Sequence, residues 1–309
     1  MRVLLATDFS SHAEDAVRIV KALPLPSGST VRVVYVLEPF PEVTAFAPAA
    51  ITEISDAAEQ QFRGELEKTA ATLRAPGRDV ETALVLGRTA DVIVEEAERS
   101  KADLIVMGSR GRRAIKSALL GSVSAEVVDH APCPVLVARG PTLRRAILAE
   151  DGSETAAAGA RLLATVPALR DLEVRVVSVV DAPFPSTLTG GDAPMATYSA
   201  VQAYYDSLPA LREATAKSAR ERAAALVAAG LAATSEVREG DAAAQLIAAA
   251  IDDRADCIVI GSHGRTGMAR VFLGSVARGV LFNAPCSVLI VRGTKVAEGE
   301  REKVLAASN

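Results

Sequence analysis

Two copies of one glycine pattern are the residues of this chain whose types and spacing most clearly suggest chemistry. Each copy reads Gly-x-x-Gly, nine further residues, and then Gly-Ser. Glycines allow backbone amides to approach an anion closely. The final Gly-Ser opens a predicted helix, whose free N–H groups and dipole favour negative charge. The pattern therefore predicts a phosphate-binding loop in each half of the chain, at Gly108, Gly111, Gly121 and Ser122 and again at Gly261, Gly264, Gly274 and Ser275.

Charged side chains accompany both copies of the pattern. Arg112 and Arg265 follow the second glycine at matching positions and add positive charge beside the predicted loop. Asp8 and Asp151 come directly after the first predicted strand of each half, where a carboxylate either faces a ligand or caps the next helix. The glycines, for their part, could serve only as tight turns. Because the whole spaced pattern follows an apolar strand twice in one chain, we favour a ligand site.

Other kinds of site find less support. No Gly-Lys-Ser/Thr follows the glycines, and no Gly-x-Gly-x-x-Gly follows the first strand, so neither a Walker A loop nor the usual dinucleotide site is predicted. His12, His130 and His263 do not cluster and show no metal-ligand spacing. Cys133 and Cys286 stand at equivalent positions before an apolar strand, and we expect them to be small buried hydrophobes.

The elements that must position these residues also occur twice. Residues 103–139 and 256–292 align without gaps at an offset of 153, and about half of the aligned positions are identical. Near the start of each half the offset is 143, so the second half carries ten extra residues, which we place in the Pro- and Gly-rich stretch 181–195. We predict two domains at 1–140 and 141–293 and a tail at 294–309.

Each half alternates apolar strands with helices. Strands are predicted at 3–7, 30–37, 80–86, 103–108 and 134–138, and in the second half at 144–149, 173–180, 233–238, 256–261 and 287–291. The long helix before the third strand is predicted at about 51–74 and 206–229. This order predicts an α/β protein with two tandem Rossmann-like, open, parallel five-stranded sheets flanked by helices. In such sheets ligands bind beyond the carboxyl ends of the strands, where Asp8, Val36 and Met107 fall.

Each half resembles an ATP-binding universal stress protein domain. The resemblance rests on the glycine pattern, on the openings DFSSHAEDA and DGSETAAAG, and on the closing stretches HAPCPVLVAR and NAPCSVLIVR. It implies bound ATP with Mg²⁺, Asp8 and Asp151 near the nucleotide and its metal, and a ribose- and phosphate-binding loop at the glycines and serines. The residues alone point only to an anion or a nucleotide.

Further positions carry over from the same resemblance. Adenine is expected at the backbone of Val36 and Val179, the strand ends under the nucleotide are Met107 and Ile260, and Val123 and Val276 follow the loop serines. His263 replaces Arg110, and Thr266 replaces Arg113, which leaves open unequal affinities at the two sites. The resemblance also implies that the last strands, 134–138 and 287–291, pair within the chain, and it allows a homodimer of whole chains.

Composition narrows the classes of function. The chain has 309 residues, a net charge of −4, no Trp and 4% aromatic residues, so its core must be aliphatic. The balanced charge disfavours a nucleic-acid partner, the apolar runs are too short to span a membrane, and three Cys do not form a disulfide framework. We expect a cytoplasmic, ATP-binding regulatory or stress-response protein. The alternatives are a slow ATPase or adenylate-forming enzyme, for which no catalytic residue stands out, and a nucleotide-free association scaffold.

Overall fold

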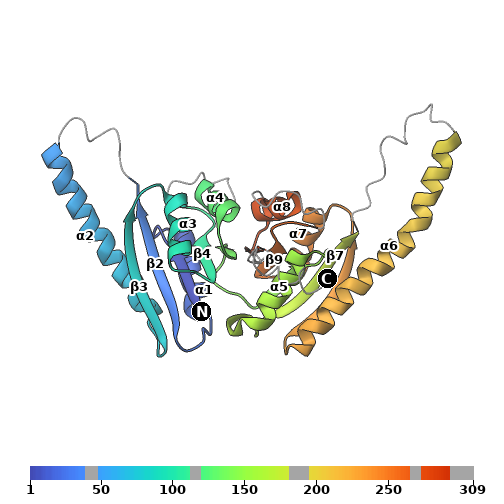
Figure 1. Ribbon diagram of the computed structural model, residues 1–309, viewed down its shortest axis with the longest axis horizontal. Coiled ribbons are helices and arrows are strands. Elements are labelled where there is room, and N and C mark those ends of the chain that lie inside the picture. Colours follow the sequence, from blue (N-terminus) through green and yellow to red (C-terminus); the bar gives the residue numbers. More distant parts are fainter. Residues whose placement is uncertain (39–47, 112–119, 181–194, 265–272, 293–309) are drawn as a thin grey trace, which may run out of the picture.

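The computed structural model describes residues 1–38, 48–111, 120–180, 195–264 and 273–292 (Figure 1). The elements of the first half are β1 (Arg2–Ala6), α1 (Ser11–Ala22), β2 (Ser29–Leu37), α2 (Pro48–Leu73), β3 (Arg78–Leu86), α3 (Thr89–Arg99), β4 (Leu104–Gly108), α4 (Ser122–His130) and β5 (Val135–Ala138). Those of the second half are β6 (Arg145–Ala149), α5 (Glu154–Thr165), η1 (Pro167–Leu169), β7 (Glu173–Val180), α6 (Met195–Ala228), β8 (Ala232–Glu239), α7 (Ala242–Asp252), β9 (Cys257–Gly261), α8 (Ser275–Asn283) and β10 (Ser287–Val291).

The strands form one continuous ten-stranded sheet in the order β3-β2-β1-β4-β5-β10-β9-β6-β7-β8. Within each half the five strands are parallel, which confirms the predicted fold class. The two sets meet at β5 and β10, which run antiparallel with Leu136 opposite Leu289. The sheet order in each half therefore places β1 and β4, or β6 and β9, side by side in the middle of the set.

Helices cover both faces of this sheet, which explains why its central strands, such as β4 and β9, are apolar and buried. One core cluster lies between the sheet and α3, α4, α7 and α8, and it includes Ile93, Val127 and Val280. The other lies under α1, α2, α5 and α6 and includes Ile19 and Leu163. Each cluster contains residues from both halves, so the two halves share their cores across the β5–β10 junction.

Part of the extra length of the second half lies in a longer helix. Helix α6 has 34 residues, whereas its counterpart α2 has 26. Figure 1 shows both helices leaning outward at the ends of the sheet, with the start of α6 far from the strands. The extra residues therefore extend beyond the predicted stretch 181–195 into the first turns of α6. Residues 181–194 lie outside the described part of the chain.

Two equivalent arginines bind across the junction between the halves. Arg139, just after β5, donates to the carbonyl oxygen of Leu281 in the last turn of α8 and to that of Cys286, just before β10. Arg292, just after β10, donates in turn to Val128 O (2.6 Å) and to the Asp129 carbonyl at the end of α4. Burial lowers the pKa of Arg139 to about 10, so its guanidinium is still charged at neutral pH. Each half thus closes the exposed end of a helix in the other half.

None of the helices in the described part of the chain has the length and apolar character that crossing a bilayer requires.

Candidate functional site

The turn after β1 holds Asp8 in a fixed orientation. The side chain and the backbone N–H of Ser10 donate to Asp8 Oδ1 at 2.6 and 3.1 Å. Ser10 is also the N-cap of α1, because its hydroxyl accepts the N–H of Ala13 at 3.2 Å. The other carboxylate oxygen faces the glycine loop, and a Cβ atom built at Gly111 would lie 2.8 Å from Asp8 Oδ2. The structure therefore brings Asp8 against the second glycine of the pattern.

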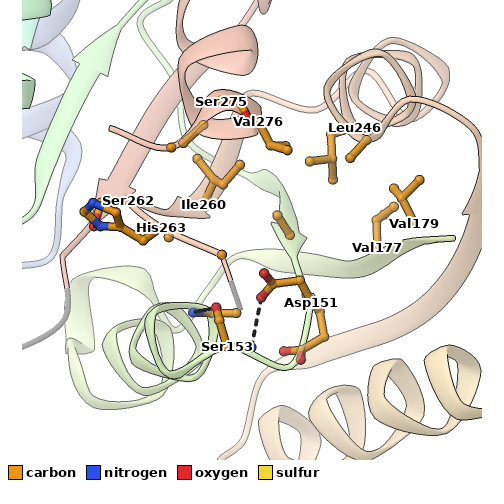
Figure 2. A pocket seen from close by; sticks show the side chains of 18 residues that line it. Asp151, Ser153, Val177, Val179, Leu246, Ile260, Ser262, His263, Ser275 and Val276 are labelled. Carbon is orange, nitrogen blue, oxygen red and sulfur yellow. Dashed lines mark hydrogen bonds between the residues drawn. The ribbon is translucent and has the colours of Figure 1, made fainter. Parts of the chain in front are cut away.

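The second half repeats this arrangement with Asp151. Its Oδ1 accepts the N–H of Ser153 at 2.9 Å, as Figure 2 shows, and Ser153 caps α5 by accepting the N–H of Ala156 at 3.1 Å. A Cβ atom at Gly264 would lie 3.0 Å from Asp151 Oδ2. Of the two roles considered for these aspartates, helix capping is filled by a serine in each half. One oxygen of each aspartate faces the glycine loop instead.

The glycines of the pattern have different structural roles. A Cβ atom at Gly108 would lie 2.7 Å from the backbone of His12, so glycine is needed there for the approach of α1. Gly121 and Gly274 are the N-caps of α4 and α8 and make no side-chain cap hydrogen bond. A Cβ atom at Gly121 would meet nothing closer than 3.5 Å, so sterics do not require glycine there. Close packing therefore requires glycine at Gly108, at the end of β4, but not at Gly121.

Without a capping side chain, the first turns of α4 and α8 present backbone N–H groups toward the carboxyl edge of the sheet. Each N-cap is tied to its loop by its own N–H, which donates from Gly121 to Ser109 O at 2.7 Å and from Gly274 to Ser262 O at 2.8 Å. Ser122 is the first helical residue and Gly121 precedes it as the N-cap, so Ser122 does not cap this helix. Orphan N–H groups at a helix start favour a bound anion.

The residues of the second site line one cavity of about 220 Å³ (Figure 2). Figure 2 shows Val177, Val179 and Leu246 on one side, Ile260 in the middle, and Asp151 below. An apolar wall thus faces a polar rim made by the turn, the glycine loop and the start of α8. The predicted residues that line this cavity are Asp151, Val179, Ile260, Gly261, Gly264, Gly274, Ser275 and Val276.

The first half places its predicted residues on the equivalent elements. Val36 is in β2, Met107 ends β4 with Gly108, and Val123 is in the first turn of α4. Val36 and Val123 pack against the core cluster that contains Met107. Arg112 and Arg265 lie outside the described residues. Across the described ranges, no group of three or more His, Cys, Asp or Glu side chains is placed to hold a metal ion.

Comparison with known proteins settles the family. The sequence profile of the Universal stress protein family matches residues 1–139 and again 142–292. The chain belongs to the universal stress protein family.

Relatives of one and of two repeats are found. A universal stress protein of Thermus aquaticus is 41% identical over 140 residues, which cover 44% of this chain and 97% of the relative. A universal stress protein of Mycobacterium tuberculosis is 30% identical over 220 residues, 69% of each chain. Among solved structures, a universal stress protein from Archaeoglobus fulgidus has a TM-score of 0.61 at 20% identity and covers 94% of this chain and 96% of its own. That likeness supports the fold.

The two universal stress protein repeats differ at Arg110 and His263, as the alignment of the repeats indicated, and in the contacts that these residues make. In the first, Arg110 contacts His12 with a nitrogen–nitrogen distance of 2.8 Å. In the second, Thr155 stands in place of His12 and donates to the carbonyl oxygen of His263. The cavity also includes Glu150, which neither its type nor its spacing suggested. Only the alignment of the repeats, with Thr7 at the equivalent position, could have marked it.

Proposed function

We propose that this universal stress protein binds ATP in both halves and acts as a regulatory or stress-response protein. The observation that carries the proposal is the cavity of the second half, where Asp151, the glycine loop and the start of α8 surround an apolar wall. Such a cavity offers a flat apolar surface for a base and a cluster of N–H groups for phosphate. A nucleotide combines both kinds of surface, whereas a simple anion would leave the apolar wall unused.

The contacts are assigned by element. Adenine would lie along Val179 and Ile260, and the ribose and phosphates would take the loop from Gly261 to Ser275. In the first half the corresponding set is Val36, Met107 and the loop from Gly108 to Ser122. Arg112 and Arg265 would add charge to the phosphates from positions outside the described residues.

We infer that Mg²⁺ enters with the nucleotide. The phosphates would supply most of its ligands, because a Mg²⁺ ion bound to a nucleotide usually needs only one or two carboxylates and keeps several waters. Asp8 and Asp151 are the carboxylates we assign to this role, through Oδ2 or through a bound water.

We further propose that the chain works as a built-in dimer in the cytoplasm, with domains at 1–140 and 141–293. The antiparallel pair of β5 and β10 and the arginines that cross between the halves support this proposal. Whole chains could associate in addition, and sedimentation velocity over a range of concentrations tests this.

The test of ATP binding uses the full chain. The purified protein is denatured and the released small molecules are identified by mass spectrometry, and titration calorimetry of the nucleotide-free chain with ATP and Mg²⁺ gives the stoichiometry. We expect two sites in the wild type and one in each of Gly111→Val and Gly264→Val, whose side chains would press on the facing aspartate. The control is Gly64→Val on the exposed face of α2, where a built Cβ atom meets nothing within 4 Å, and two sites should remain. A wild type that carries no adenine nucleotide and shows no ATP heat refutes the proposal.

The same samples separate a binder from an enzyme. Release of ADP or of an adenylate from the loaded chain would favour the slow ATPase or adenylate-forming alternative. Stable bound ATP over the same period would favour the regulatory protein, and no bound nucleotide would favour the scaffold.

A further inference from the structure

Glu150 directly follows β6, the strand that leads into the second site, and its carboxylate is buried. The side chain has no exposed surface, yet it lines the cavity floor next to Asp151. Three donors surround it: the N–H of Gly152 at 2.7 Å, the hydroxyl of Ser218 at 3.1 Å and Nε of Arg222 at 2.6 Å. Two of these donors come from α6. One carboxylate therefore connects the long helix to the turn that presents Asp151.

The first half supports the equivalent turn with different chemistry. Thr7 replaces Glu150, and its hydroxyl accepts the N–H of Phe9 at 3.1 Å. The Phe9 ring stacks on Tyr35 with a centroid distance of 5.0 Å, and Tyr35 stacks on Phe62 of α2 at 4.5 Å. The second half has small residues at these three positions, namely Gly152, Ser178 and Thr215. The aromatic stack is thus replaced by a buried ion pair.

The two supports respond differently to movement of the helix. Stacked rings attract over a broad range of offsets, so a shift of α2 would change their energy gradually. A buried charge is costly once its partner is removed, so Glu150 and Arg222 must stay together. The backbone of the turn must follow Glu150, because the Gly152 N–H is bound to the same carboxylate oxygen as Ser218. Movement of α6 therefore moves the turn.

We propose that Glu150 and Arg222 are positioning residues that make ligand affinity at the second site depend on the placement of α6. This dependence is steeper than that of the first site on α2, which acts there only through stacked rings. This inference rests on the proposed nucleotide binding. It makes the two sites of the chain unequal, because only the second is tied through an ion pair to a helix that reaches far from the sheet (Figure 1). A contact made on α6 would then alter the second site alone.

The test variant is Glu150→Thr with Arg222→Thr, which copies Thr7 and Thr69 of the first half and leaves no unpaired charge. The matched control is Glu213→Thr with Arg220→Thr, which removes an exposed ion pair of the same residue types from the same helix. Both pairs are made in the full chain. Thermal unfolding of both variants shows whether each is folded.

Binding of ATP is measured by calorimetry in the Gly111→Val background, which isolates the second site, and in the Gly264→Val background, which isolates the first. We expect the test variant to weaken the second site about tenfold, the size of one lost hydrogen bond to a charged group. The first site, and both sites of the control, should stay within twofold of the wild type. A second site that keeps wild-type affinity, or equal losses at both sites, overturns the inference.

Hydrogen exchange supplies a readout that needs no ligand. In the nucleotide-free chain we expect the peptide that spans Gly152 and Ser153 to exchange about tenfold faster in the test variant and unchanged in the control. In the wild type, ATP should protect the second half of α6 but not α2. If no ATP binds at all, the proposed function fails, and unchanged exchange of the turn then separately overturns the role given to the ion pair.

Discussion

Replacing Arg139 with Met tests whether the arginines between the halves hold the two cores together. Met keeps the apolar stem of the side chain but loses its hydrogen bonds to the carbonyl oxygens of Leu281 and Cys286. The bond to Cys286 is long, at 3.4 Å, so we count one strong bond. A hydrogen bond to a charged group contributes about 2 kcal/mol, and a carbonyl left without a partner costs about 1 kcal/mol more. We therefore expect the free energy of unfolding to fall by about 3 kcal/mol.

The assay is urea denaturation followed by far-UV circular dichroism, because the chain has no Trp for fluorescence. Arg292→Met should behave similarly, since its guanidinium makes the equivalent contacts with Val128 and Asp129. The control is Arg63→Met, which breaks an exposed pair with Glu59 and should cost less than about 0.5 kcal/mol. If Arg139→Met lies within that same margin of the wild type, the contacts across the junction do not stabilise the fold as argued.

Three further predictions concern single residues. Burial raises the pKa of the Cys133 thiol to about 12 and that of Cys286 to about 11, and it also raises the pKa of Cys257. The unfolded chain therefore loses these protons first, stability falls as pH rises above 9, and at pH 9 iodoacetamide should alkylate the unfolded chain but not the native one. Glu96→Gln should lower the unfolding free energy by about 3 kcal/mol in urea titration, because the buried carboxylate pairs with Arg32 at 2.9 Å. An unchanged midpoint would contradict it. Phe9→Ala should cost about 3 kcal/mol by the same assay through loss of the stack on Tyr35, and a loss below 1 kcal/mol would show that the stack carries little.

The parts of the fold that follow local patterns could be predicted. Strands such as Leu104–Gly108 and Cys257–Gly261 can be predicted because helices bury both of their faces, which makes their sequences apolar. The internal repeat then gives the order of the remaining elements in each half. The start of α6 was missed because the side chains described there, such as Gln202 and Ala203, are exposed and create no helical period. The buried residues of α6, among them Ala219 and Leu226, lie further along the helix. Its Ala-rich composition permits a helix but does not require one.

The candidate site was predicted in outline only. Asp151 and Gly264 are separated by more than a hundred residues, yet the strand order brings them together, and the position of both at strand ends made that foreseeable. The pair of Glu150 and Arg222 was not foreseeable, because its members are 72 residues apart and lie on a strand end and a helix that no motif connects. The role of Gly121 as an N-cap also depends on the path of the chain before the helix, which spacing does not reveal.

The antiparallel junction of β5 and β10 has a consequence for how this chain can change over generations. In a symmetric pair of separate chains, each substitution appears in both copies, so one site cannot be altered while the other is kept. Here the two copies are joined by the short segment between Ala138 and Arg145, which also makes their association independent of protein concentration. Each half can therefore accumulate substitutions while the other half preserves the shared sheet. The turn of the second half has in this way acquired a buried carboxylate, whereas the turn of the first half is still supported by three aromatic rings.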